Sequence, residues 1–215
     1  MSFLFGDALR QRIARHLAGF PRRSITELGL RRAAVVLVVA RTGAEHAALA
    51  DDACILLTKR PENLRRHAGQ FALPGGRLDE GETAEAAALR ELHEELRLEL
   101  EPAAILGTLD DYATRSGFVI TPIVAWGGAA EDLTPDPVEV ARVLRIPFRD
   151  LDSPDIPHLD PQGEGAPPVL SAPLATLGHK VYAPTAAMLY QFREVALHGR
   201  ETRGAHFDQP RFAWK

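Results

Sequence analysis

Three glutamates, Glu91, Glu94 and Glu95, lie within about one turn of a segment rich in alanine, leucine, arginine and glutamate, a composition that favours a helix. With about 100° of rotation per residue, the three carboxylates share one arc of that helix. Like charges at this spacing destabilise an isolated helix, by roughly a few tenths of a kcal/mol per pair. A hard divalent cation reverses that effect, because Mg²⁺ prefers oxygen ligands and retains several waters. The spacing therefore predicts either a site for Mg²⁺ or Mn²⁺, or a solvated charged face.

The residues before this helix predict a tight turn and a defined helix start. Pro74 precedes Gly75 and Gly76, and an acidic turn then leads to Thr83. The Thr83 hydroxyl can accept from an unpaired backbone N–H, so we expect the helix to begin at about residue 84. Small residues beside the acidic arc would let a loop or a ligand approach the helix backbone. These residues are Ala84, Ala87 and Ala88.

A basic stretch directly precedes the glycine turn. Its five basic side chains are Lys59, Arg60, Arg65, Arg66 and His67. Arginine suits phosphate because its planar fork donates two parallel hydrogen bonds. The stretch predicts either a binding surface for an anionic substrate or a charged connection that turns at residues 61–63.

The acidic segment resembles the signature of the Nudix hydrolases. The resemblance rests on Gly76, then five residues, Glu82, then seven residues, the run Arg90 to Glu95, and Leu98. It implies an α/β fold, the Nudix α/β/α sandwich with a mixed central sheet, and cleavage of a nucleoside diphosphate linked to another group. The family has glycine where this chain has Arg97. That glycine serves a left-handed residue at the helix end, so the departure concerns the helix end and leaves the carboxylates in place.

The resemblance also implies roles for individual side chains. Glu91, Glu94 and Glu95 would hold the metal, and Glu82 would bind an outer metal or orient Arg90. Arg90 would hold the carboxylates in position. The general base is either a helix glutamate or Glu139, an acidic loop residue that is otherwise read as a solvated carboxylate.

A second motif resembles the coenzyme A pyrophosphatase branch of the same family. It comprises residues 56–58, Arg60, Leu64 and Arg65, His67, Gly69 and Gln70, and residues 74–76, with Leu73 in place of the usual aromatic. The substrate-side candidates are Arg60, Arg65, His67, Gly69, Gln70, Gly75 and Gly76. Coenzyme A would give 4′-phosphopantetheine and adenosine 3′,5′-bisphosphate. ADP-ribose or another nucleoside diphosphate derivative is the alternative substrate, because the chain departs from the family at Arg97 and at residues 181–184, where the family has Ile-Trp-Gly. A non-catalytic nucleotide sensor is the second alternative.

Apolar and turn patterns predict the remaining elements. Ala33 to Ala40 is apolar without alternation, which predicts a fully buried strand that pairs with residues 53–58. Residues 103–112 and 118–126 are expected strands around a turn at Gly117, where either a plain hairpin or a substrate contact is expected. A strand or strand-to-helix transition is expected over residues 138–146. Residues 151–178 are expected to be an irregular, exposed connection, followed by a strand at 180–182 and a helix over 185–197.

Composition limits the classes of protein. The chain has 215 residues, a net charge of −4 and one cysteine, Cys54, which fits a buried residue in a reducing, cytoplasmic compartment. An acidic chain is a poor nonspecific nucleic-acid binder, and the longest apolar run is too short to cross a membrane. We expect a basic extension over residues 1–31 that is helical and packed on the core, a Nudix domain over 32–200, and a tail over 201–215. A homodimer is compatible with the sequence.

Overall fold

The protein is described from a computed structural model, which covers residues 3–26, 29–43, 49–63, 67–161, 168–207 and 209–210. Its centre is an eight-stranded mixed sheet in which β3, β2, β1, β7 and β5 are neighbours in that order. The strands β4, β6 and β8 pair with β1, β7 and β2 respectively. The central pair, β1 (Arg31–Arg41) and β7 (Phe118–Gly128), is parallel, and the other pairs are antiparallel.

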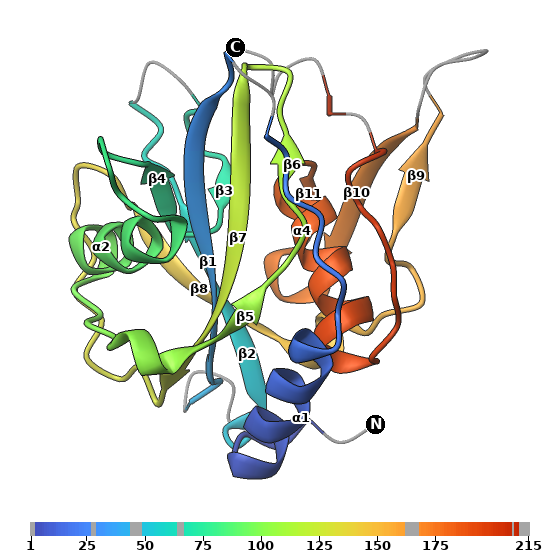
Figure 1. The fold of residues 1–215 in the computed structure, drawn as a ribbon. Coiled ribbons are helices and arrows are strands. Elements are labelled where there is room, and N and C mark those ends of the chain that lie inside the picture. Colours follow the sequence, from blue (N-terminus) through green and yellow to red (C-terminus); the bar gives the residue numbers. More distant parts are fainter. Residues whose placement is uncertain are drawn as a thin grey trace.

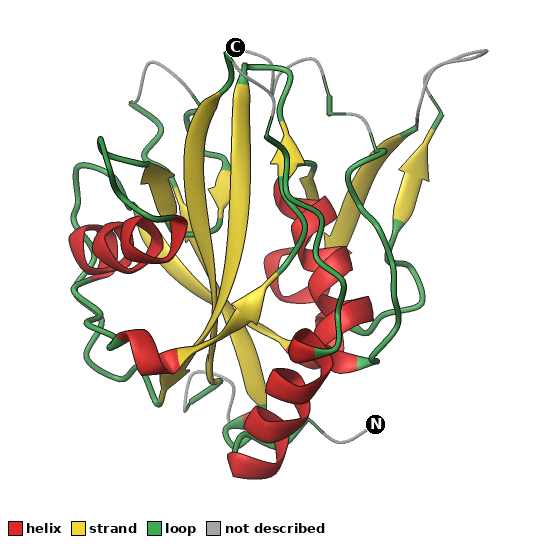
Figure 2. Ribbon diagram, in the orientation of Figure 1, coloured by secondary structure: helices red, strands yellow, loops and turns green. Residues whose placement is uncertain are grey.

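Helices cover both faces of this sheet (Figures 1 and 2). On one face, Leu37 and Val39 of β1 belong to the core that contains α1 (Asp7–Ala18) and α4 (Thr185–Phe192). On the other face, Val36 and Val38 belong to the core that contains α2 (Ala84–Leu96). Because both faces are covered, residues 33–40 of β1 are apolar on both sides of the strand, which explains why this run does not alternate. The predicted α/β/α sandwich is therefore present.

The strands predicted from the sequence occur with adjusted bounds. The expected pairing of β1 with β2 (Ala53–Lys59) is confirmed, and β8 (Arg142–Pro147) pairs with β2 on its other side. β3 (Phe71–Ala72) and β4 (Gly75–Arg77) bracket the glycine turn. Gly117 supplies the expected left-handed turn between β6 (Tyr112–Ala113) and β7, with φ of 85°.

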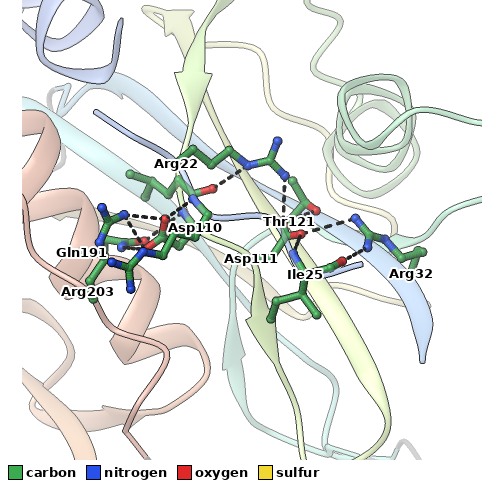
Figure 3. A network of polar contacts seen from close by, with 10 residues as sticks. Arg22, Ile25, Arg32, Asp110, Asp111, Thr121, Gln191 and Arg203 are labelled. Carbon is green, nitrogen blue, oxygen red and sulfur yellow. Dashed lines mark hydrogen bonds and ion pairs between the residues drawn. The ribbon is translucent and has the colours of Figure 1, made fainter. Parts of the chain in front are cut away.

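The single strand expected over residues 103–112 was wrong. The chain instead forms the 3-10 turn η2 (Pro102–Ala104), the strand β5 (Ile105–Thr108), a break, and then β6. Asp110 and Asp111 occupy the break, where their buried carboxylates bind arginines from both ends of the chain (Figure 3). Asp111 contacts Arg22 and Arg32, and Asp110 contacts Arg203. Two carboxylates turned inward for these ion pairs interrupt the strand.

Residues 151–178 also differ from the prediction of an irregular, exposed connection. After α3 (Phe148–Leu151), the chain forms β9 (His158–Asp160) and β10 (Val169–Leu174), while residues 162–167 lie outside the described part. The buried β10 pairs with β9 and with β11 (His179–Tyr182), and the 3-10 turn η3 (Ala175–Leu177) links β10 to β11. This second sheet lies beside α4 (Figure 1). Gly178 ends η3 in the left-handed conformation before β11, whereas Pro173 lies within β10.

The helices match their predicted extents closely. Thr83 caps α2 by accepting from the backbone N–H of Ala86, at 3.2 Å. α4 continues into the π-helical turn η4 (Arg193–Leu197), so the segment predicted over 185–197 is helical throughout. α1 buries Leu9, Ile13 and Leu17 in the main core. In the described part of the chain, no helix combines the length and apolarity needed to cross a bilayer.

Arg97 adopts the left-handed conformation at the end of α2, with φ of 55°. We expect Arg97→Gly to raise the free energy of unfolding by about 1 kcal/mol, because glycine adopts this conformation without steric cost. Arg97→Ala is the control, because it removes the charge but keeps the conformational cost. Denaturant unfolding measures both variants. An equal gain in the alanine variant would assign the effect to charge and contradict the backbone explanation.

Candidate active site

Gly75 and Gly76 bring the turn against both the sheet and α2. They pair with Val35 and Ala34 of β1. A Cβ atom on Gly75 would lie 2.3 Å from the carbonyl oxygen of Ala34, and one on Gly76 would lie 2.3 Å from Oε1 of Glu91. Side chains do not fit at either position, so the glycines allow the Glu91 carboxylate to lie directly against β4.

Arg90 lies at the centre of the carboxylates. Its Nε and Nη2 atoms donate to the two carboxylate oxygens of Glu82, at 2.9 and 3.0 Å. Its Nη1 atom donates to Glu91 and to Glu94, each at 3.0 Å, and Nη2 also donates to the carbonyl oxygen of Arg77. The hydrogen bond from Arg90 lowers the pKa of Glu82. The guanidinium thus holds three carboxylates of like charge together, and both oxygens of Glu82 are used to orient it.

Glu95 is the buried member of the acidic arc, with 4% of its surface exposed. Burial, followed by the charge of Glu139, raises its pKa to about 8, although the backbone N–H of Gly75 donates to its carboxylate. Its Oε2 atom has no hydrogen-bond partner among the described residues. A buried carboxylate with an open oxygen is costly unless a proton or a cation compensates it.

Glu139 reaches this region because its loop caps the end of α2. The backbone N–H groups of Thr134 and Asp136 donate to the carbonyl oxygens of Leu96 and Glu95, at 2.9 and 2.8 Å. The turn that follows carries Glu139, whose side chain is exposed. The charge of Glu139 contributes to raised pKa values of Glu91 and Glu95, although burial is the larger cause for both. The strand expected from residue 138 begins only at Arg142, because residues 138–141 belong to this capping loop.

A divalent cation fits the chemistry of these residues. Among the described residues, no three carboxylate or imidazole side chains are already gathered closely enough to hold a metal, since Glu91 and Glu94 point to Arg90. The open oxygen of Glu95 and the mutual repulsion of Glu91, Glu95 and Glu139 are nevertheless the features that a cation would relieve. Glu95 with Glu91 and Glu94 could supply oxygen ligands, and water could complete the set.

The alanines of α2 do not leave room for a loop or a ligand beside the helix backbone, contrary to the prediction from the sequence. Ala87 and Ala88 are fully buried and pack in the same core cluster as Ala34 and Val36 of β1. The sheet, and neither a loop nor a ligand, approaches the helix at these positions.

A cavity of about 680 Å³ adjoins the glycine turn. Six of the predicted substrate-side residues line it, namely Arg60, His67, Gly69, Gln70, Gly75 and Gly76. The seventh, Arg65, lies outside the described residues, as does Arg66. This volume is within the range of about 300–1,000 Å³ that is usual for small-molecule sites. The basic motif and the acidic helix are therefore neighbours across the glycine turn.

Arg60 links the cavity to the acidic helix. It lines the cavity, and its charge lowers the pKa of Glu95 in part, against the larger effects of burial and of Glu139. Its Nε atom is buried and has no hydrogen-bond partner among the described residues. The backbone N–H of Arg60 donates to the carbonyl oxygen of Gln70, which places the turn at 67–70 beside it. An anionic ligand could accept from this guanidinium while remaining close to Glu95.

His67 and Gln70 form a pair within that turn. His67 has a left-handed backbone, with φ of 54°, and its Nδ1 atom lies 3.1 Å from Oε1 of Gln70. Because each side chain fixes the other, both are held at the cavity wall.

Much of the remaining cavity wall was missed from the sequence. Thr114, Ser116 and Phe118 line it, so the hairpin of β6 and β7 does contribute to the cavity, an option that the sequence left open. Residues 179–185 of β11 and the start of α4 also line it. The departure of residues 181–184 from the family pattern was the only signal for this part. Arg77, whose guanidinium lies 5.3 Å from the centre of the Phe118 ring, had no signal beyond its charge.

Comparison with known proteins was made for sequence and for fold. Cronobacter sakazakii has a protein named "Uncharacterized Nudix hydrolase NudL" that is 37% identical over 131 residues, which cover 60% of this chain and 63% of that protein. Nudix hydrolase 3 of Caenorhabditis elegans is 41% identical over 101 residues, which cover 45% of this chain and 42% of that protein. The chain thus spans less than two thirds of the length of these curated relatives.

Solved structures agree on the fold. A MutT/nudix family protein from Enterococcus faecalis has a TM-score of 0.53 and 14% identity, covering 89% of this chain and 75% of that one. At this identity the likeness shows the fold alone. Residues 29–165 match the family described as the NUDIX domain, which is more than half of the chain. The chain therefore belongs to the Nudix family.

Proposed function

We propose that this protein is a divalent-metal-dependent pyrophosphohydrolase that hydrolyses the diphosphate of coenzyme A or of one of its derivatives. The observation that carries the proposal is the buried Glu95, whose Oε2 atom has no hydrogen-bond partner among the described residues and whose carboxylate interacts with the charge of Arg60 in the cavity wall. A cation at Glu95 and an arginine at the cavity together suit a diphosphate, which carries its negative charge on several oxygens.

In this proposal, Glu95, Glu91 and Glu94 hold Mg²⁺ or Mn²⁺. The bound ion would neutralise charge on the phosphate oxygens and lower the pKa of a bound water. Arg90 keeps the carboxylates at their spacing, and Glu82 orients Arg90 through its two hydrogen bonds. Of the two roles expected for Glu82, binding an outer metal or orienting Arg90, the proposal assigns it the second.

The proposed general base is Glu139. Glu94, the helix alternative, already accepts a hydrogen bond from Arg90. Glu139 forms no ion pair with another residue in the described ranges, and its charge acts on both Glu91 and Glu95. An exposed carboxylate beside the metal ligands is free to accept a proton from the attacking water.

The residues around the cavity support a bulky substrate such as coenzyme A. Arg60, His67, Gly69 and Gln70 of the upstream motif line the cavity. Apolar residues of the sheet, which include Val35, Phe118 and Ile120, line it as well. A substrate with an anionic part and an extended organic part could contact both the basic and the apolar residues of this wall. A sensor without catalysis is disfavoured because all three helix glutamates are present.

A substrate panel tests this proposal. The purified protein is incubated with Mg²⁺ or Mn²⁺ and with coenzyme A, an acyl derivative, ADP-ribose or a dinucleoside polyphosphate, and the products are separated by chromatography. We expect 4′-phosphopantetheine and adenosine 3′,5′-bisphosphate from coenzyme A. Cleavage of ADP-ribose without cleavage of coenzyme A would replace the substrate assignment, and cleavage of none would overturn the proposed activity.

A further inference from the structure

Part of the cavity wall comes from residues beyond the NUDIX match, which ends at residue 165. Gln209 lines the cavity together with Tyr182 and Thr185, and only 4% of the Gln209 surface is exposed. Glutamine is seldom buried to this extent, and a buried amide usually forms hydrogen bonds. A buried uncharged amide in a cavity wall is a group that can recognise a hydrogen-bonding ligand.

Several contacts fix the segment that carries Gln209. Its Nε2 atom donates to the carbonyl oxygen of Ala113 at 3.4 Å. The Tyr112 hydroxyl donates to the carbonyl oxygen of Phe207 at 2.9 Å. Both partners belong to β6, which hydrogen-bonds to β7 at the cavity. Gln209 and Phe207 are therefore both attached to β6 of the central sheet.

Asp110 anchors the beginning of the same segment (Figure 3). Its two carboxylate oxygens accept from Nη1 of Arg203, at 2.8 and 3.0 Å, and one of them accepts from Nε2 of Gln191, at 2.8 Å. Gln191 of α4 also donates to the carbonyl oxygen of Thr202. At Gly204 a Cβ atom would lie 3.1 Å from the carbonyl oxygen of Ala187, so the segment packs tightly on α4.

We infer that Gln209 is a specificity-determining residue, which binds an uncharged hydrogen-bonding part of the substrate away from the scissile diphosphate. Arg203 is a positioning residue that acts through the segment joining it to Gln209. The inference rests on the proposed function for the identity of the substrate. Arg60, which suits phosphate, comes from the upstream motif, whereas Gln209 and Thr185 come from later segments and offer uncharged groups, although Lys180 of β11 also lines the cavity. An amide-containing arm attached to the diphosphate is the chemistry that this wall would recognise.

The test is steady-state kinetics of Gln209→Ala with Mg²⁺ and coenzyme A. We expect KM to rise about tenfold and kcat to change less than twofold, because a contact made equally in the ground and transition states is lost. Gln11→Ala, which removes the same group from an exposed site on α1, is the matched control and should leave KM unchanged. Arg203→Ala should raise KM in the same direction, and its thermal midpoint is measured to separate any loss of folded protein from the change in KM.

The possible results separate a failure of this inference from a failure of the proposed function. An unchanged KM in Gln209→Ala, with normal turnover by the unmodified protein, overturns this inference and leaves the proposed function intact. A rise in KM that is equally large for ADP-ribose, which lacks an amide-containing arm, also overturns it. If the unmodified protein cleaves none of the diphosphates, the proposed function fails and this inference falls with it.

Discussion

Glu95→Gln is expected to lower Mg²⁺-dependent turnover on the order of 10³-fold while the protein remains folded. Gln keeps the size of the side chain and can still accept the hydrogen bond from the backbone N–H of Gly75. It cannot supply the negative charge that a cation needs at Oε2, the oxygen without a hydrogen-bond partner in the described part of the chain. The measurement is product release from coenzyme A at saturating Mg²⁺, with circular dichroism to verify folding.

Two further variants sharpen this result. Glu94→Gln is expected to reduce turnover as well, because Glu94 belongs to the proposed ligand set. Glu99→Gln is the matched control, since Glu99 is exposed just beyond the end of α2 and should be neutral. Undiminished turnover in both Glu94→Gln and Glu95→Gln would contradict the metal site.

The second large effect concerns stability without metal. Burial raises the pKa of Glu95 from 4.5 to about 8, so between these values the folded protein retains a proton that the unfolded chain has lost. The free energy of unfolding should therefore fall as the pH rises from 5 to 8, by roughly 3–4 kcal/mol. Glu95→Gln removes this contribution. Urea unfolding in the presence of a chelator, at both pH values and for both proteins, measures the difference.

At pH 8, Mg²⁺ should stabilise the unmodified protein more than Glu95→Gln. A ligand that binds only the folded state stabilises it, by about 2.7 kcal/mol at 100 times its dissociation constant. The unmodified protein should gain stability on addition of Mg²⁺, and Glu95→Gln should gain little. If both proteins show the same pH dependence in chelator and the same gain with Mg²⁺, the buried carboxylate is neither the titrating group nor a metal ligand.

Features decided by nearby residues could be predicted from the sequence. The start of α2 at residue 84 follows from the Thr83 cap, and the left-handed end at Arg97 follows from the motif. The position of β1 follows from its uninterrupted apolar run. Arg60 and Gln70, which the family resemblance offered as substrate-side candidates, line one cavity with the glycine turn. In each case a few neighbouring side chains determine the conformation.

Features decided by distant residues could not be predicted. The break at Asp110 and Asp111 exists because arginines from residues 22–32 and from position 203 reach the two carboxylates. β10 pairs with both β9 and β11, and the proline-rich sequence around these short strands resembles a loop. The place of Gln209 in the cavity wall depends on contacts with β6, about 95 residues earlier in the chain. No local pattern encodes such contacts.

The departure at residues 181–184 has a structural meaning. Val181 and Ala183 are buried, and both contribute to the cavity wall. The loss of the family's tryptophan at this point leaves Tyr182 as the aromatic residue of the segment. The departure therefore lies in the wall of the cavity. Under the proposed function, it would bear on which substrate is bound.

The central claim is that the acidic arc of α2 holds divalent cations against a diphosphate. The most direct measurement is an anomalous difference map from crystals of the protein soaked in Mn²⁺. We predict a peak at about 2.0–2.3 Å from a carboxylate oxygen of Glu95, with Glu91 or Glu94 turned from Arg90 toward it. The absence of any peak beside Glu95 at saturating Mn²⁺ would contradict the claim.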